Sequence, residues 1–586
     1  MAYLEVACKA ANLNDVDNVD WVPTLSLEHP VSDTELPVNR SMEGNTLDEW
    51  KVEYLLDSGV NAQQTRENVV HRRTKRMPSF HRRILCELLE ALRPKHLKLE
   101  IDLSNLLFAK IPQPGRRLPL LGHLLLLMKK GVHISESSFE GFSKLAVDFH
   151  KHGLFALQLA FQPILHIFTP EYFENVMTST KHINKATGYK PVVPWLGTGL
   201  IVSGGEKWHK DRKMLTPAFH FKILDQFNPL MNKHASILCD KISSTLNYQM
   251  TDCVSVLSTC ALDTICETSM GVDMKTQTVG ENKFSSSFTE FNKLAVKRVF
   301  TVGSKSDFLY NLTPNGQKAK LMIKNMHEFT EQIVVQRKKE IMSMCASDDN
   351  GTKKKLRSLL DLMLDIHLNG GDLSIKEIQF QLDNFAFAGH DTVSNALAFV
   401  MVCLANYSDV QQRVREEINE SVSDSVTEIT SEHLAKLPYL DMVIKESLRL
   451  YPPVPFTGRH LLEDFQIGDY MIPKGTDIWL NYFALHRNPD YWAEPEKFDP
   501  ERFSPENSID RHPFAFVPFS GGLRNCIGQR YAKAFMKIVI VQIMRHFRIL
   551  PVTRIDDLTL SFEMTIKTME PIQIKFRPVD GRVEEM

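Results

Sequence analysis

Ten residues near the C-terminal end of the chain, FSGGLRNCIG from Phe519 to Gly528, limit what this protein can be more than any other feature. A cysteine thiolate is a soft ligand for iron, and as the proximal ligand of a haem it donates electron density that favours O–O cleavage. Gly522 and Gly528 let the backbone approach a bound group closely, and backbone amides directed at the sulfur of Cys526 would stabilise its charge. We therefore predict that Cys526 is a metal ligand, bound to the iron of a haem.

The surroundings of Cys526 favour a charged sulfur. A helical pattern begins at Ile527, so the positive N-terminal end of a helix is expected beside the thiolate. Arg524 can pair with an anionic haem propionate. The alternative is a small buried apolar residue, the usual role of a lone cysteine, and we assign that role to the other eight of the nine cysteines. Few and scattered cysteines also indicate a reducing compartment.

The composition excludes several other classes of protein. With 586 residues, 43% of them hydrophobic and 24% charged, the chain can bury a large core, which rules out a disordered chain or a small disulfide scaffold. Its 69 basic and 71 acidic residues give a net charge of −2, so no nucleic-acid partner is expected.

Helical spacing of apolar residues dominates most of the chain. The predicted helices are Ile223–Leu246, Cys253–Met270, Lys318–Met344, Ser374–Ala405, Val410–Val422, Tyr439–Leu450 and Ile527–Phe547. After Tyr451 the chain is rich in loops, and turn residues such as Gly468 and Pro473 separate short strand-like pieces. We predict one mainly α body with a minor β portion, from about residue 110 to residue 578.

Two further pairs are spaced to share one helix face. Glu446 and Arg449 stand three residues apart, and Trp208 and Arg212 stand four apart. A Glu–Arg pair alone is a weak signal, because most such pairs are surface ion pairs of little energetic value.

The segment AGHDT, Ala388–Thr392, lies inside the longest predicted helix. A glycine, an acid and an alcohol are all unfavourable in the middle of a helix, which suggests a functional reason for Asp391 and Thr392. The alternative is a helix kink in which the hydrogen-bonding groups of Thr392 are satisfied. We expect His390 to make an ordinary polar contact rather than to bind metal.

Residues 519–528 match the haem-thiolate signature FxxGxRxCxG of the cytochromes P450 at every position, and the other motifs follow in that family's order. The chain is thus identified by resemblance as a member of that family over residues 106–586, with the mainly α cytochrome P450 fold. Residues 1–105 lack the family's usual membrane anchor and are left unassigned, as a disordered or mispredicted extension. Membrane attachment would then be peripheral, through Leu118–Met128, or absent.

The resemblance also implies roles for individual residues. The residues expected to bind the haem propionates are Trp208, Arg212, Arg459 and Arg524. Those expected to support the haem-side core are Glu446, Arg449, Arg502, Phe519, Gly522 and Gly528. Asp391 and Thr392 are expected to be catalytic and to handle protons during oxygen activation.

Longer stretches are similar to family 4 cytochromes P450, particularly those of arthropods; they are residues 194–221, 260–271 and 437–459. Many members of family 4 carry a glutamate that forms an ester with the haem. This chain has Ala388 at that position, so the resemblance implies haem b held without a covalent link.

The function implied is monooxygenation of apolar substrates such as fatty acids, terpenoid or hormone-like lipids, or xenobiotics including insecticides. NADPH and flavins would act only through a partner, NADPH-cytochrome P450 reductase, with cytochrome b5 as a further electron donor. The expected location is the cytosolic face of the endoplasmic reticulum membrane. The alternatives are an O2-independent haem-thiolate isomerase or dehydratase, and a non-catalytic haem-binding protein. Asp391 and Thr392 argue against the first, which has no use for a proton-handling pair.

Overall fold

The computed structural model describes residues 108–115, 117–118, 121–160, 162–280, 283–301, 306–347, 358–423 and 425–579. The extension predicted for residues 1–105 lies outside these residues, so its interpretation stays a prediction.

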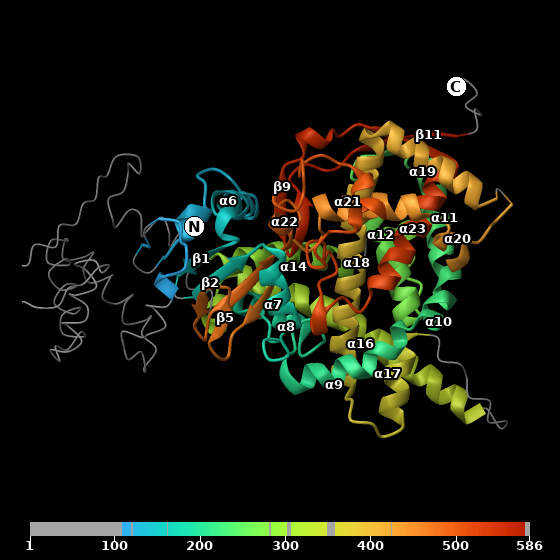
Figure 1. Ribbon diagram of the computed structural model, residues 1–586. Helices are drawn as coiled ribbons and strands as arrows, with labels where there is room; N and C mark the ends of the chain where they lie inside the picture. The colour runs from blue at the N-terminus through green and yellow to red at the C-terminus, as the bar shows by residue number, and fades with distance from the viewer. Residues whose placement is uncertain are drawn as a thin grey trace, which may run out of the picture. The chain divides into compact units, whose positions relative to one another are not determined.

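Helix α18, Ile375–Asn406, is the central element of the described body (Figure 1). Its sequence is apolar on nearly every face, as expected for a helix with neighbours all round. A capping box defines its start, because the Ser374 hydroxyl accepts from the Glu377 N–H while the Glu377 carboxylate accepts from the Ser374 N–H. Among the described helices, α18 alone is long and apolar enough to cross a membrane, but 83% of its apolar stretch is buried within the protein. It is therefore a core helix.

Helices make up most of the body. Besides α18 they are α6 Ile134–Asp148, α7 Pro170–Thr178, α8 Val193–Leu196, α9 Gly205–Leu215, α10 Phe221–Leu224, α11 Asn228–Ser244, α12 Cys253–Ile265, α13 Thr276–Val279, α14 Lys283–Val299, α15 Asp307–Leu312, α16 Pro314–Ser347, α17 Leu359–Leu368, α19 Ser408–Ser421, α20 Ser431–Ala435, α21 Pro438–Leu450, α22 Tyr482–Leu485 and α23 Gln529–His546. Helix α18 packs against α12, α16, α21 and α23.

Two predicted helices differ from the observed ones. The helix predicted over Ile223–Leu246 is split, because Pro229 lacks an N–H and sits in the first turn of α11, where none is needed. The helix predicted over Cys253–Met270 continues beyond α12 as a π-helical turn, Cys266–Met270, which ends at Gly271 with a positive φ of 73°.

The strands form small sheets beside the helices. They are β1 Leu154–Leu159, β2 Gln162–Ile167, β3 Gln249–Met250, β4 Phe456–His460, β5 Phe465–Ile467, β6 Tyr470–Ile472, β7 Asp477–Asn481, β8 Phe547–Pro551, β9 Leu560–Glu563, β10 Thr565–Thr568 and β11 Ile574–Pro578. The largest described sheet has the order β1-β2-β7-β4, in which only the β2–β7 pair is parallel. Strands β9 and β10 form a separate antiparallel hairpin.

The segment Leu118–Met128 is partly core and partly surface. Leu124 and Leu127 are buried in a 3-10 turn, Leu124–Leu127, that packs on α6. Leu118 and Leu126 are 44% and 53% exposed.

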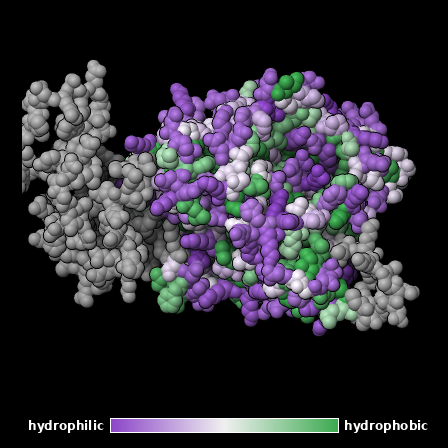
Figure 2. Space-filling view, turned by 60° about the horizontal axis from the view of Figure 1, so that its bottom comes forward, coloured by the Kyte–Doolittle hydropathy of each residue, from purple (hydrophilic) through white to green (hydrophobic). Residues whose placement is uncertain are grey.

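Hydrophilic residues cover most of the face in Figure 2, with hydrophobic residues in separate groups between them.

Candidate functional site

One short stripe of α18 is open. Between residues 381 and 405 every side chain is buried except those of Ala388, Gly389 and Thr392. Ala388 and Thr392, four residues apart, lie on one side of the helix, whereas Gly389 lies about 100° around the helix from Ala388. A Cβ on Gly389 would lie 2.6 Å from Cγ1 of Ile265 in α12, so glycine at this position allows the two helices to pack closely. The predicted AGHDT motif thus holds the partly exposed residues of an otherwise buried helix segment, and its glycine is the point of close contact with α12.

The Cys526 loop connects Phe519 to α23 and has a specific backbone shape. The Cys526 N–H donates to the Phe519 carbonyl oxygen at 2.8 Å. Gly522 has φ of 62°, and a Cβ there would lie 1.9 Å from the Met177 carbonyl oxygen, so only glycine fits. At Gly528, by contrast, a Cβ would meet no protein atom within 4 Å, so protein packing gives no reason for that glycine.

Cys526 is the exposed member of the six free cysteines that the structure describes. The protein around it raises its pKa through desolvation, while the Gly528 N–H and the Arg212 guanidinium act in the opposite direction. The other five described cysteines are buried. Burial raises the pKa of Cys239, for example, to about 12. Among the described cysteines, Cys526 therefore has the accessible sulfur that a metal can reach.

A loop before α9 links the open stripe of α18 to the Cys526 loop. Gln381 Oε1 accepts from the Leu200 N–H at 3.0 Å, and Asn384 Oδ1 accepts from the Ile201 N–H at 2.9 Å. The Arg524 guanidinium in turn donates to the carbonyl oxygens of Ile201 and Ser203, at 3.0 and 2.9 Å. These hydrogen bonds connect α18 to the Cys526 loop, which is far from it in sequence, through the loop before α9.

Three cations lie together beside this loop. The backbone of Lys185 pairs with that of Arg459 in β4. Burial, followed by the charges of Arg524 and Arg459, lowers the pKa of Lys185 well below its usual value. Burial and the charge of Arg459 lower the pKa of Arg524 to about 9. No ion pair to a carboxylate is found for any of the three within the described residues, so the cluster fits an anionic ligand of more than one charge.

Trp208 and Arg212, both on α9, have different surroundings. Trp208 is 3% exposed, and the Arg524 guanidinium lies over its ring at 4.8 Å. Arg212 instead donates to the Asn525 carbonyl oxygen at 2.8 Å and to its Oδ1 at 2.6 Å. The structure thus brings Trp208, Arg459 and Arg524 together, whereas Arg212 braces the loop next to Cys526.

Sequence reasoning missed Lys185. It stands in the segment KHINKATGYK, where nothing local distinguishes it from other lysines. Its position is unusual only because β4 brings Arg459 against it.

These residues fit a haem. An accessible thiol with an N–H directed at it suits the iron, and three clustered cations that have no carboxylate partner among the described residues suit two propionates. Ala388 and Thr392 are partly exposed on one side of the core helix, so that side is accessible to a bound group.

The two residues predicted to handle protons have separate partners. The Thr392 hydroxyl donates to the Ala388 carbonyl oxygen at 2.6 Å. Asp391, 4% exposed, accepts from the Thr565 hydroxyl and the Lys567 ammonium of β10, at 2.5 and 2.6 Å. Burial is the largest single influence and raises the pKa of Asp391, but Lys567, His390 and the Thr565 hydroxyl together outweigh it and the pKa is lowered. His390 bonds through Nε2 to the Ser258 hydroxyl, an ordinary polar contact.

Glu446 and Arg449 form a fully buried pair on α21. Arg449 Nε and Nη2 donate to the two carboxylate oxygens at 2.7 and 2.8 Å, and both side chains are 0% exposed. Arg502 adds an ion pair, with its Nε 3.4 Å from Glu446 Oε1. The structure therefore brings the predicted Glu–Arg–Arg network together. Removing one member of such a network leaves a buried charge without its partner, which typically costs about 3–5 kcal/mol.

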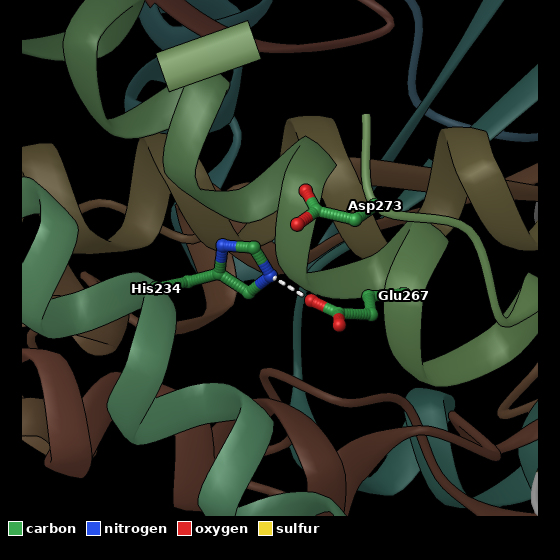
Figure 3. Close-up of side chains that lie close together, drawn as sticks. All are labelled: His234, Glu267 and Asp273. Atoms are coloured by element: carbon green, nitrogen blue, oxygen red, sulfur yellow. Dashed lines mark hydrogen bonds and ion pairs between the residues drawn. The ribbon is translucent and has the colours of Figure 1, made fainter. Parts of the chain in front are cut away.

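A second cluster of potential metal ligands lies on α11 and beyond the end of α12 (Figure 3). His234 Nε2 lies 2.6 Å from the Glu267 carboxylate, with Asp273 beside it. The Lys233 ammonium bonds to both carboxylates, at 2.8 Å from each. The Lys233 ammonium offsets part of the charge of the two carboxylates and His234 bonds to one of them, so the cluster is an ion-pair and hydrogen-bond network.

The chain was compared with known proteins. Residues 112–576 match the model of the family "Cytochrome P450". Similar curated proteins include cytochrome P450 4V2 of Homo sapiens, 36% identical over 80% of this chain and 89% of that protein, and cytochrome P450 4c3 of Drosophila melanogaster, 36% identical over 71% and 80%. The crystal structure of the cytochrome P450DA haem domain shares the fold, with a TM-score of 0.67 and 24% identity over 80% of this chain and 97% of that one.

The match to these relatives agrees with the features described above, namely the Cys526 loop, the clustered cations and the open stripe of α18. The chain belongs to the cytochrome P450 family, resembles its family 4 members, and is a haem-thiolate monooxygenase.

Proposed function

We propose that this monooxygenase hydroxylates apolar small molecules, namely fatty acids, terpenoid or hormone-like lipids, or xenobiotics such as insecticides. The observation that carries the proposal is the partly exposed stripe at Ala388, Gly389 and Thr392, which directly follows the α18 member of an aromatic cluster. Next to it Phe387 packs against Trp195 and Phe288, with ring centroids 5.6 and 5.9 Å apart. Apolar walls with few polar groups are typical of pockets for lipid-like ligands.

Bound haem supplies the activation of O2 and the insertion of one oxygen atom into the substrate. Cys526 Sγ would bind the iron, with the Gly528 N–H stabilising the sulfur charge. Lys185, Arg459 and Arg524 would hold the propionates. Of these, Arg459 is 2% exposed, and its guanidinium donates to the neighbouring Gly458 carbonyl oxygen at 3.2 Å.

Thr392 and Asp391 would handle the protons that oxygen activation consumes. The Thr392 hydroxyl, which now donates to the Ala388 carbonyl oxygen, can turn toward the open side of α18 because it lies on the open stripe. Asp391 is the neighbouring carboxylate and can hold a proton at Oδ1 or Oδ2. Thr392→Ala should keep the haem spectrum yet divert reducing equivalents to peroxide or water.

The haem would be held without a covalent bond. Ala388 stands on the open stripe and has no oxygen that could form an ester. Retention would then depend on the Cys526–iron bond, the cation cluster and apolar burial.

Electrons would come from NADPH through NADPH-cytochrome P450 reductase, with cytochrome b5 as a second donor. Exposed basic residues surround the Cys526 loop, including Lys213 on α9 and Arg530 on α23. An acidic flavoprotein surface would be attracted to such a face.

The protein would lie at the cytosolic face of the endoplasmic reticulum membrane. Exposed apolar side chains on α15 support contact with lipid, since Phe308 and Leu312 are 73% and 66% exposed. Leu118 and Leu126 are also exposed, on the segment that packs against α6. Phe300, just beyond α14, lies near Phe142 of α6 with ring centroids 6.5 Å apart, so the chain leading to α15 starts close to α6.

The deciding experiment is turnover of the purified protein, reconstituted with reductase, on a mixed panel of lipids and xenobiotics with product mass spectrometry. We expect hydroxylated products that need both NADPH and O2. The reduced protein with CO should show the far red-shifted Soret band that a thiolate ligand produces, and Cys526→His should lose both the band and the products. Product formation without O2, or a retained band in Cys526→His, would contradict the proposal.

A further inference from the structure

The acidic residue next to Thr392 is tied to a hairpin from the far end of the chain. The Asp391 carboxylate accepts from Lys567 and Thr565, both on β10, and more weakly from Asn395 Nδ2 at 3.3 Å. Successive helix residues are about 100° apart, so Asp391 points to the side of the open stripe rather than along it. Its contacts therefore hold the carboxylate away from the position where Thr392 lies.

The β9–β10 hairpin is anchored on two elements that carry site residues. Thr565 and Lys567 alternate along β10, so both side chains leave the same face and reach α18. Between them the Ile566 N–H donates to the Pro453 carbonyl oxygen at 2.8 Å, in the segment that leads into β4 and Arg459. The hairpin is thus fixed in position relative to both the proton-handling helix and the cation cluster.

Lys567 is the member of the Asp391 network that meets solvent. Its side chain is 20% exposed, whereas that of Asp391 is 5% exposed. The charged and titratable groups around Asp391 are Lys567 from β10, His390 from α18 itself and Glu563 from β9. Glu563 is half-buried and also meets the charges of Lys293 on α14 and His133 before α6. A proton from water reaches Asp391 most directly where the Lys567 contact lies.

We propose that Lys567 and Thr565 are positioning residues for the monooxygenase reaction: they hold the Asp391 carboxylate ionised at the side of α18, and opening of the Lys567 contact admits the proton to Asp391 Oδ1. This inference rests on the proposed role of Asp391 and Thr392. The Asp391–Lys567 ion pair does not only pack the hairpin on α18. It also controls when the Asp391 carboxylate can take up a proton from solvent.

The charge on Lys567 also helps to set the protonation state of the Asp391 carboxyl. Lys567 and His390 both lower the pKa of Asp391, and burial raises it, so loss of Lys567 leaves burial to dominate. The acid limb of the pH–rate profile should then move to higher pH in Lys567→Met. Lys567→Arg keeps the charge and should restore the wild-type limb.

The test compares Lys567→Met, Lys567→Arg and Thr565→Val in the full-length haem protein with reductase. Lys575→Met, an exposed lysine on β11, is the matched control. NADPH consumption, peroxide and product are measured from pH 5.5 to 9, together with turnover driven by added hydrogen peroxide. We expect Lys567→Met to lose about tenfold in kcat with KM within twofold, to release more peroxide, and to keep its peroxide-driven turnover.

The inference is overturned if Lys567→Met keeps the wild-type pH profile and coupling, if Lys567→Arg is equally impaired, or if peroxide-driven turnover falls in parallel. If Lys567→Met loses the thiolate band with CO, the test relies on Thr565→Val, which removes one hydrogen bond and no charge. The same measurements on Thr565→Val then decide whether the inference holds. Failure of the wild-type protein to form product contradicts the proposed function instead. In that case infrared spectroscopy measures the band of a protonated carboxyl, which is assigned to Asp391 by its absence in Asp391→Asn. The pH dependence of this band reports whether Lys567→Met raises the pKa of Asp391. A band unchanged from wild type overturns the inference.

Discussion

Ala388 gives the clearest test of cofactor retention at the scale of one residue. It lies on the open stripe of α18, and its carbonyl oxygen is already engaged by Thr392. Ala388→Glu places a carboxylate on this stripe, and we expect a fraction of the haem to become covalently attached during turnover. Denaturing chromatography measures that fraction, which should be zero in the wild-type protein. Ala388→Gln is the control, because it has the same length and no carboxylate; haem that co-elutes with wild-type protein would contradict the prediction.

Lys185 tests the cation cluster. Desolvation and the charges of Arg524 and Arg459 lower the pKa of its ammonium, an arrangement that is unfavourable unless an anion is bound. We expect Lys185→Met to speed haem transfer to apomyoglobin about tenfold, since charge-assisted hydrogen bonds contribute roughly 1.5–3 kcal/mol. Lys190→Met, an exposed lysine of the same segment, should leave the rate unchanged. Equal rates for wild type and Lys185→Met would show that Lys185 does not hold a propionate.

At the scale of elements, the contact between α12 and α18 depends on Gly389. Alanine there would place its Cβ 2.6 Å from Ile265 Cγ1, and overpacking costs about 1–3 kcal/mol. The better helix propensity of alanine offsets about 1 kcal/mol of this. We expect Gly389→Ala to lower the free energy of unfolding by urea in the wild-type background and to raise it when Ile265→Ala is already present. An equal effect in both backgrounds would mean that the two positions are not coupled.

Element boundaries were predictable where local chemistry sets them. The helix predicted over Ser374–Ala405 is observed as α18, because Ser374 and Glu377 form its capping box. The helix predicted from Ile527 begins at Gln529, since Gly528 is its N-cap. The π-helical turn after α12 was not predictable, as its side chains are helical in pattern and only packing against α17 and α18 distinguishes it.

At the scale of the whole molecule, buried histidines should make the fold sensitive to mild acid. Burial lowers the pKa of His166 and His486 to about 3 and that of His390 to about 4. Below pH 6.5 the unfolded chain binds protons that these neutral side chains cannot, so stability falls as pH falls. Each contributes a loss of about 1.4 kcal/mol per pH unit between its unfolded and folded pKa values.

Urea unfolding between pH 7 and 5 measures this dependence. His390→Gln keeps a partner for Ser258 and removes one titrating group, so the slope of unfolding free energy against pH should fall by about one proton. His152→Gln, a substitution at an exposed histidine, is the control. An unchanged slope in His390→Gln would show that His390 is protonated in the folded protein.

The sequence by itself determined the chemistry that short segments carry. The Glu446–Arg449 pair depends on two residues three apart on one helix, so its spacing was sufficient to predict it, whereas Gly522 is required because the distant Met177 carbonyl oxygen lies against it. Only the tertiary structure decided which distant groups meet. Lys185 faces Arg459 because β4 brings it there, and Asp391 is held by Lys567 because the β9–β10 hairpin packs on α18. Burial gives these charges their strength, and burial is a property of the packed chain rather than of any segment.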